Sequence, residues 1–139
     1  MSGQDPISIE EALIYVMVIV AASDNSMTDN ELATIGDMIK TLPVFKDYNP
    51  NNVIPAAQRC GDILQDENGL SLVLELVGDI LPSKLYDTAY ALAVEVAAAD
   101  LHVEKEELRI LQLLRDRFSL DKLTVAAIER GAIARHRTA

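Results

Sequence analysis

Residues 18–24 read Val-Ile-Val-Ala-Ala-Ser-Asp, and the pattern returns at residues 94–100 as Val-Glu-Val-Ala-Ala-Ala-Asp. When the match is extended to residues 18–35 and 94–111, seven positions are identical, which in the first copy are Val18, Val20, Ala21, Ala22, Asp24, Glu31 and Leu32. Self-similarity at a fixed separation indicates repeated supersecondary units. The sequence therefore predicts two related helix pairs, each closed by a turn that contains Asp.

The segment that leads into the first copy is unusually apolar. From Ala12 to Ala22 every residue is apolar, and a helix without a polar face must be surrounded by other helices. A buried strand also fits such a run, but the length of the segment and the Glu10-Glu11 pair before it favour a helix. We expect this helix and its counterpart in the second copy to be buried against each other.

Hydrophobic spacing extends this prediction to a compact all-α bundle of seven helices in one domain, residues 1–139. The internal repeat covers about 8–42 and 84–118, and its two halves are expected to pack with pseudo-two-fold symmetry. The seven helices are expected at about 8–23, 29–41, 53–65, 68–81, 84–99, 104–117 and 120–135. Residues 43–52, which contain two Pro and three Asn, are expected to form the longest loop.

Helix starts and inward-facing stripes follow from the same pattern. Thr28-Asp29-Asn30-Glu31 predicts a capping box, Ser83 is expected to cap the fifth helix, and Ser119 or Asp121 the seventh. The expected inner residues are Leu32, Ile35 and Ile39 in the second helix, Leu108, Leu111, Leu114 and Phe118 in the sixth, and Leu123, Ala127 and Ile128 in the seventh.

Composition and charge exclude several classes of function. The net charge of −10 argues against a nucleic-acid partner, because phosphates require cationic neutralisation. The acids dominate residues 1–69, with 11 acids against 3 bases, whereas the C-terminal Arg130, Arg135, His136 and Arg137 are locally basic. This basic stretch fits either a helix C-terminus that favours cations or a docking patch for an acidic partner.

Neither a leader nor a membrane span is predicted. The N-terminus has no positively charged segment, and the apolar run is too short for a bilayer, which needs about 20 residues. We therefore expect a cytoplasmic protein without direct membrane insertion. The single cysteine, Cys60, excludes an internal disulfide and is expected to be a buried, inert thiol.

The duplicated turns carry a resemblance to a known family. Asp24-Asn25-Ser26-Met27 followed by Glu31, and Asp100-Leu101-His102-Val103 followed by Glu107, resemble the two copies of Asp-Gly-x-(Ile/Val)-x-x-x-Glu in the TerB-like tellurite-resistance family. The family glycine is replaced by Asn25 and Leu101. Asn accepts a left-handed backbone more readily than Leu does, so the second turn is expected to differ in conformation.

The resemblance implies a small cytoplasmic helical domain of tellurite-resistance and related stress systems. Proteins of this family are associated with membrane-bound and metal-binding partners and are not known for catalysis. Their acidic positions have been suggested to bind a metal or a partner. By this resemblance, the protein is expected to have a protein partner in a stress-response or membrane-associated complex.

The acids of the two turns, Asp24, Glu31, Asp100 and Glu107, are the candidate site. Calcium and magnesium prefer several carboxylate and carbonyl oxygens, so a divalent cation is the candidate cofactor, although its identity stays open. The competing explanation is structural, since Asp and Glu at a helix start also cap the backbone and complement the helix dipole. The turns are not EF-hands, because Asp29 and Ile35 stand where that loop needs Gly and Glu.

Three functional hypotheses remain. The first is a non-enzymatic stress-response module whose acidic helix-turn-helix corners contact a partner protein or weakly bind a divalent cation. The second is a dedicated cation-binding domain that its ion stabilises. The third, a remote alternative, is an enzyme that uses Cys60 or His102. The sequence identifies neither the partner nor the oligomeric state.

Overall fold

A computed structural model of the chain describes residues 7–23, 27–99 and 105–139, and within these ranges it contains seven α-helices and no strand. This confirms the all-α bundle. The helices are α1 (Ile9–Ala21), α2 (Asp29–Thr41), α3 (Val53–Leu64), α4 (Gly69–Ile80), α5 (Tyr86–Ala98), α6 (Lys105–Phe118) and α7 (Lys122–Arg135). All seven lie within about two residues of their predicted bounds.

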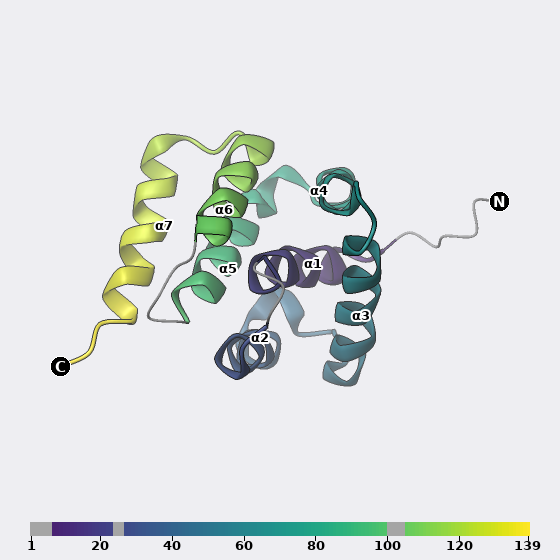
Figure 1. Cartoon of the computed structure of the whole chain (residues 1–139). Helices are drawn as coiled ribbons and strands as arrows, with labels where there is room; N and C mark the ends of the chain where they lie inside the picture. Colours follow the sequence, from purple (N-terminus) through teal and green to yellow (C-terminus); the bar gives the residue numbers. More distant parts are fainter. Residues whose placement is uncertain (1–6, 24–26, 100–104) are drawn as a thin grey trace.

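Helix α1 runs through the middle of the molecule (Figure 1). Every residue from Ala12 to Ala21 is at most 2% exposed, and α2, α3, α4, α5 and α6 all pack against this helix. The continuous apolar run therefore has its expected role, because neighbours cover each face of α1. Helix α5 is the second buried helix, and it lies between α1 and the outer pair α6 and α7.

The two copies of the repeat share a burial pattern in the described residues. Glu31 and Glu107 are buried, Leu32 and Leu108 are about half exposed, and Ile35 and Leu111 are buried. Helix α2 of the first copy also packs on α5 of the second, and α6 of the second copy packs on α1. The copies thus have similar local environments, whereas a two-fold axis between them stays a prediction.

In the described part of the chain, side-chain caps mark the starts of three of the seven helices, α1, α2 and α7. Ser8 and Glu11 form a capping box on α1, Thr28 and Glu31 form the predicted one on α2, and Asp121 caps α7. Hydrogen bonds from Thr124 lower the pKa of the Asp121 carboxyl. The expected cap at Ser83 is wrong, because this residue lies inside a short 3₁₀ helix, Ser83–Leu85, that precedes α5 without a side-chain cap.

The segment between α2 and α3 is more ordered than a plain loop. Two 3₁₀ turns, Pro43–Phe45 and Pro50–Asn52, divide it, and each begins with a proline. Proline presets the backbone angle that a helical first residue needs. Phe45 is 1% exposed, so the segment contributes an aromatic side chain to the core.

Several expected inner residues are exposed instead. Leu32 is 50%, Leu108 54% and Leu123 81% exposed, and Ala127 also faces solvent. The remaining predicted inner residues of α2 and α6 are buried, namely Ile35, Ile39, Leu111, Leu114 and Phe118. Only the first position of each stripe differs, because Glu31 and Glu107 are buried where Leu32 and Leu108 were expected. Helix α7 packs chiefly on α5 along a narrow line that includes Ala132. None of the helices among the described residues has the length and apolarity that a bilayer crossing requires.

Candidate functional site

Glu31, the glutamate of the first acidic corner, uses its carboxylate to cap the start of α2. Its Oε1 accepts hydrogen bonds from the backbone N–H of Thr28 at 2.9 Å and from the Thr28 hydroxyl at 3.1 Å. In return, the Glu31 backbone N–H donates to Thr28 Oγ1 at 3.1 Å. Capping thus explains the position of Glu31, whose residue is only 3% exposed.

The second corner places Glu107 in the first turn of α6, where the residue is 4% exposed. Neither glutamate projects outward, contrary to what a shallow acidic site requires. The other two predicted ligands, Asp24 and Asp100, lie outside the described residues, as does His102. Within the described ranges no group of three or more His, Cys, Asp or Glu could hold a metal ion.

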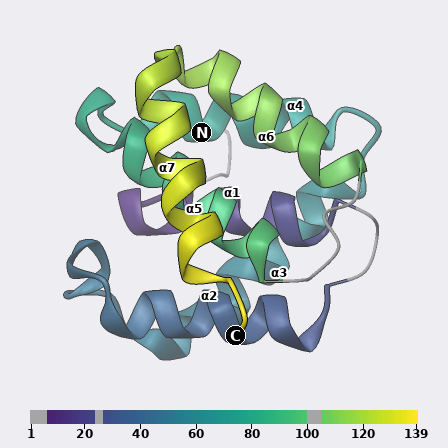
Figure 2. The same ribbon diagram turned by 90° about the vertical axis from the view of Figure 1, so that its left-hand side faces the viewer.

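A larger feature lies elsewhere, where α6 and α7 diverge over α5 (Figure 2). The space between the two helices is a groove of about 820 Å³, which we call the α6–α7 groove. Its apolar lining comes from all three helices and consists of Val94, Ala97, Ala98, Leu108, Leu111, Ala132 and Ile133. No pattern in the sequence predicts this groove, because the divergence of two helices leaves no periodic signal.

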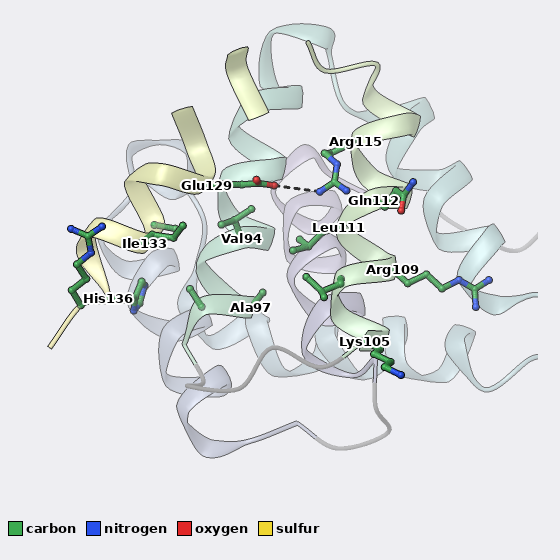
Figure 3. Close-up of a pocket in the computed structure, with 14 residues that line it drawn as sticks. Val94, Ala97, Lys105, Arg109, Leu111, Gln112, Arg115, Glu129, Ile133 and His136 are labelled. Atoms are coloured by element: carbon green, nitrogen blue, oxygen red, sulfur yellow. Dashed lines mark hydrogen bonds and ion pairs between the residues drawn. The ribbon is translucent and has the colours of Figure 1, made fainter. Parts of the chain in front are cut away.

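Cationic side chains border the α6–α7 groove on both sides (Figure 3). Lys105, Arg109 and Arg115 stand on α6, while His136 and Arg137 follow the end of α7. Among the lining residues that the structure describes, Glu129 is the single acid. In a chain with a net charge of −10, this concentration of positive charge marks the groove as distinct from the rest of the surface.

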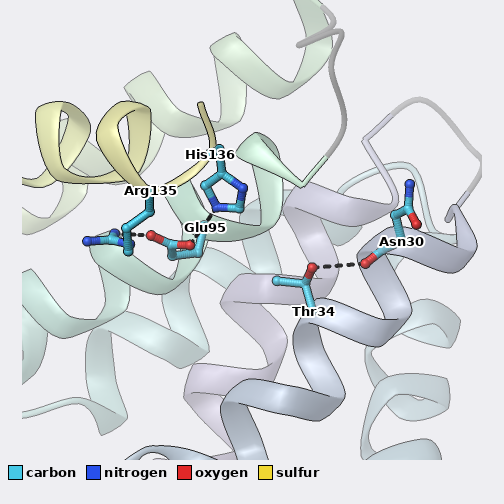
Figure 4. A network of polar contacts seen from close by, with 5 residues as sticks. All are labelled: Asn30, Thr34, Glu95, Arg135 and His136. Carbon is cyan, nitrogen blue, oxygen red and sulfur yellow. Dashed lines mark hydrogen bonds and ion pairs between the residues drawn. The ribbon is translucent and has the colours of Figure 1, made fainter. Parts of the chain in front are cut away.

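Part of the basic C-terminal stretch is neutralised locally. Glu95 on α5 forms an ion pair with Arg135, and its Oε2 lies 2.8 Å from His136 Nε2 (Figure 4). These contacts attach the end of α7 to α5. These contacts within the chain account for Arg135 and His136, so no partner protein is needed to explain them. Arg137 lies at the border of the groove and is not part of these contacts.

The inner end of the groove contains a polar network. The Tyr90 hydroxyl donates to Glu129 Oε2 at 2.5 Å and accepts from Arg115 Nη1 at 2.8 Å, and Arg115 also contacts Glu129 at 3.3 Å. Burial, helped by the hydrogen bond to Glu129, raises the pKa of Tyr90 to about 12. The network thus joins α5, α6 and α7 through a neutral phenol.

Cys60 is fully buried beside α1, with its Sγ 4.0 Å from the carbonyl oxygen of Tyr15. Burial raises the pKa of this thiol to about 12. Since the thiolate is the reactive form of cysteine, Cys60 is a poor nucleophile at neutral pH. The buried thiol predicted from the sequence is therefore confirmed.

Comparisons with known proteins find no match for this chain. No family model, no curated protein and no solved structure matches it. The resemblance to the TerB-like family therefore rests on the two acidic turns and on the order of the helices.

Proposed function

We propose that this chain is a non-enzymatic stress-response module of the tellurite- or metal-resistance type, which contacts a partner protein through its duplicated helix corners. The observation that carries the proposal is the repeated pair of a buried glutamate and an exposed leucine at the start of α2 and of α6. Leu32 is 50% and Leu108 54% exposed, next to Glu31 and Glu107.

Helix capping accounts for Glu31, but it gives no reason for an exposed leucine one residue later. An isolated exposed leucine is ordinary. Two of them at matching positions of a repeat fit a surface kept for contact, since apolar anchors supply much of the energy of an interface. The acid excess of residues 1–69 would steer a basic partner toward the first corner.

The test is a capture experiment with the full chain. Leu32→Ser/Leu108→Ser should lose the partner that the wild type retains, while Leu72→Ser, at a leucine of α4 that is 44% exposed, should retain it. Circular dichroism and thermal melting check that both variants fold. Equal capture of the partner by all three proteins would refute the corner as the contact.

A cation-binding domain is the second candidate, and one observation favours it. The two copies of the repeat each place a glutamate at the same position, Glu31 and Glu107, and calcium and magnesium prefer carboxylate oxygens as ligands. A bound calcium or magnesium ion would raise the melting temperature progressively with its concentration. The rise should disappear in Glu31→Gln/Glu107→Gln. Unchanged melting with calcium, magnesium, zinc and manganese would eliminate this candidate.

A further inference from the structure

We propose that the α6–α7 groove binds a single-chain anionic amphiphile, with fatty-acid anions as the chemical class. The hydrocarbon chain would lie on the apolar lining residues, which form the floor of the groove. The carboxylate would face the cationic side chains of Lys105, Arg109 and Arg137 at its border. This inference goes beyond the proposed function, with which it shares only Leu108.

The floor of the groove suits a hydrocarbon chain. Val94, Ala97, Leu111, Ala132 and Ile133 line it, and these side chains offer no hydrogen-bonding group. The alanines are small, so a ligand can approach the helix backbones closely. The volume of about 820 Å³ falls within the range of roughly 300–1,000 Å³ that is typical of small-molecule sites.

The border supplies the charge that such a ligand needs. Among the described residues, Lys105, Arg109 and Arg137 form no ion pair, whereas Arg115 and His136 are engaged with Glu129 and Glu95. An anionic headgroup could therefore lie at either side of the groove, near Lys105 and Arg109 of α6 or near Arg137 after α7, without breaking an ion pair of the fold. Cations around an apolar floor are complementary to a molecule with one charged end and one apolar end.

The same features argue against two other occupants. An anionic membrane surface would be repelled by the net charge of −10. An extended peptide would bring backbone N–H and C=O groups onto the apolar floor, whose side chains offer no partner for them, and leaving such groups unpaired costs free energy. A free amphiphile of small size satisfies both the apolar floor and the cationic border.

The experiment is a titration of the full chain with decanoate at concentrations where decanoate is monomeric. We expect saturable one-to-one binding by calorimetry, with amide shifts concentrated at Val94, Ala97 and Ile133. Decyltrimethylammonium, which has the same chain and the opposite charge, should not bind. Anionic phosphatidylglycerol vesicles form a separate arm and should not bind either.

Charge variants test the border. Lys105→Gln/Arg109→Gln/Arg137→Gln should weaken decanoate binding about tenfold, because each exposed charge contact contributes on the order of a factor of two. The matched control, Lys40→Gln/Lys46→Gln/Lys84→Gln, removes the same charge from exposed lysines away from the groove and should bind like the wild type. Equal weakening in both variants would overturn the headgroup assignment.

Floor variants test the chain site. Ile133→Asp places a charge on the floor at a residue that is 51% exposed, and it should abolish binding, whereas Leu72→Asp should not. Absence of decanoate binding, shifts that spread without saturation, or binding of vesicles alone would overturn the proposal. Leu32→Ser should leave decanoate binding unchanged, so failure here and failure of the corner hypothesis are distinguishable.

Discussion

Replacing Tyr90 with phenylalanine removes one hydroxyl from the contact of α5, α6 and α7 and leaves the ring in place. The lost contacts are a 2.5 Å bond to Glu129 and a 2.8 Å bond from Arg115. Hydrogen bonds to charged groups contribute roughly 1.5–3 kcal/mol. Because the Arg115 and Glu129 side chains are 31% and 40% exposed, water replaces part of what they lose, and we expect a destabilisation of about 1.5 kcal/mol.

The measurement is urea denaturation of the wild type, Tyr90→Phe and a matched control. Tyr86→Phe serves as that control, since the Tyr86 ring stacks on Phe118 at a centroid distance of 4.8 Å and the phenylalanine ring preserves this contact. It should shift the free energy of unfolding by less than about 0.5 kcal/mol. A Tyr90→Phe effect as small as that of the control would refute the energetic role of the network.

The pH dependence of the free energy of unfolding provides a second test of Tyr90→Phe. Burial raises the pKa of Tyr90 from its ordinary 10.0 to about 12 in the folded chain, so the unfolded chain ionises first as the pH rises. The stabilising contribution is therefore complete below pH 10 and is lost between pH 10 and about 12. The stability gap between the wild type and Tyr90→Phe should narrow over that interval, and a gap that widens would contradict the argument.

Three further predictions follow from local geometry. Thr28→Ala should lower the free energy of unfolding, measured by urea denaturation, by about 1 kcal/mol because it removes a helix cap. The control, Thr34→Ala, loses only a hydrogen bond to a carbonyl of its own helix and should cost less than half of that. Equal costs would contradict the capping argument. Gly69→Ala should lower the free energy of unfolding by roughly 1–3 kcal/mol, because the added Cβ would clash with the backbone carbonyl oxygen of Ile63. At Gly61 an added Cβ would meet nothing within 4 Å, so Gly61→Ala should be neutral or stabilising. Cys60 should react with a thiol reagent only as fast as the chain opens, so fast labelling under native conditions would disprove its burial.

The element order could be predicted from the sequence because strong local signals mark it. The length of the apolar run from Ala12 to Ala22, together with Glu10 and Glu11 before it, favours a surrounded helix over a strand, and Thr28 with Glu31 specifies where α2 begins. Pro43 and Pro82 follow the ends of α2 and α4, because a proline cannot continue a helix interior. Each of these signals acts within one or two turns of chain, so no knowledge of distant contacts is required.

The first position of the stripes in α2 and α6 could not be predicted in the same way. Leu32 and Glu31 are neighbours on the helix, and both fit a stripe that continues through Ile35. Helix α2 packs on α1 and α5, so the residue that faces inward depends on contacts between segments far apart in sequence. The intuition that leucine lies inside and glutamate outside therefore failed at both copies of the repeat.

The α6–α7 groove was beyond sequence reasoning for a related reason. The locally basic C-terminal stretch was visible in the sequence, and Arg137 belongs to that stretch, which also fits a docking patch. The angle at which α7 leaves α6 depends on how the two helices pack on α5, and no local pattern encodes that angle. Only the packed structure brings Lys105 and Arg137 to the same opening.

The burial of α1 has a consequence for biosynthesis. When Cys60 has just been synthesised, α1 has only α2 and most of α3 available to cover its apolar surface. The other three helices that pack on α1, namely α4, α5 and α6, are still to be synthesised. Folding of this protein must therefore be cooperative and late, and truncated products should depend on chaperones or aggregate.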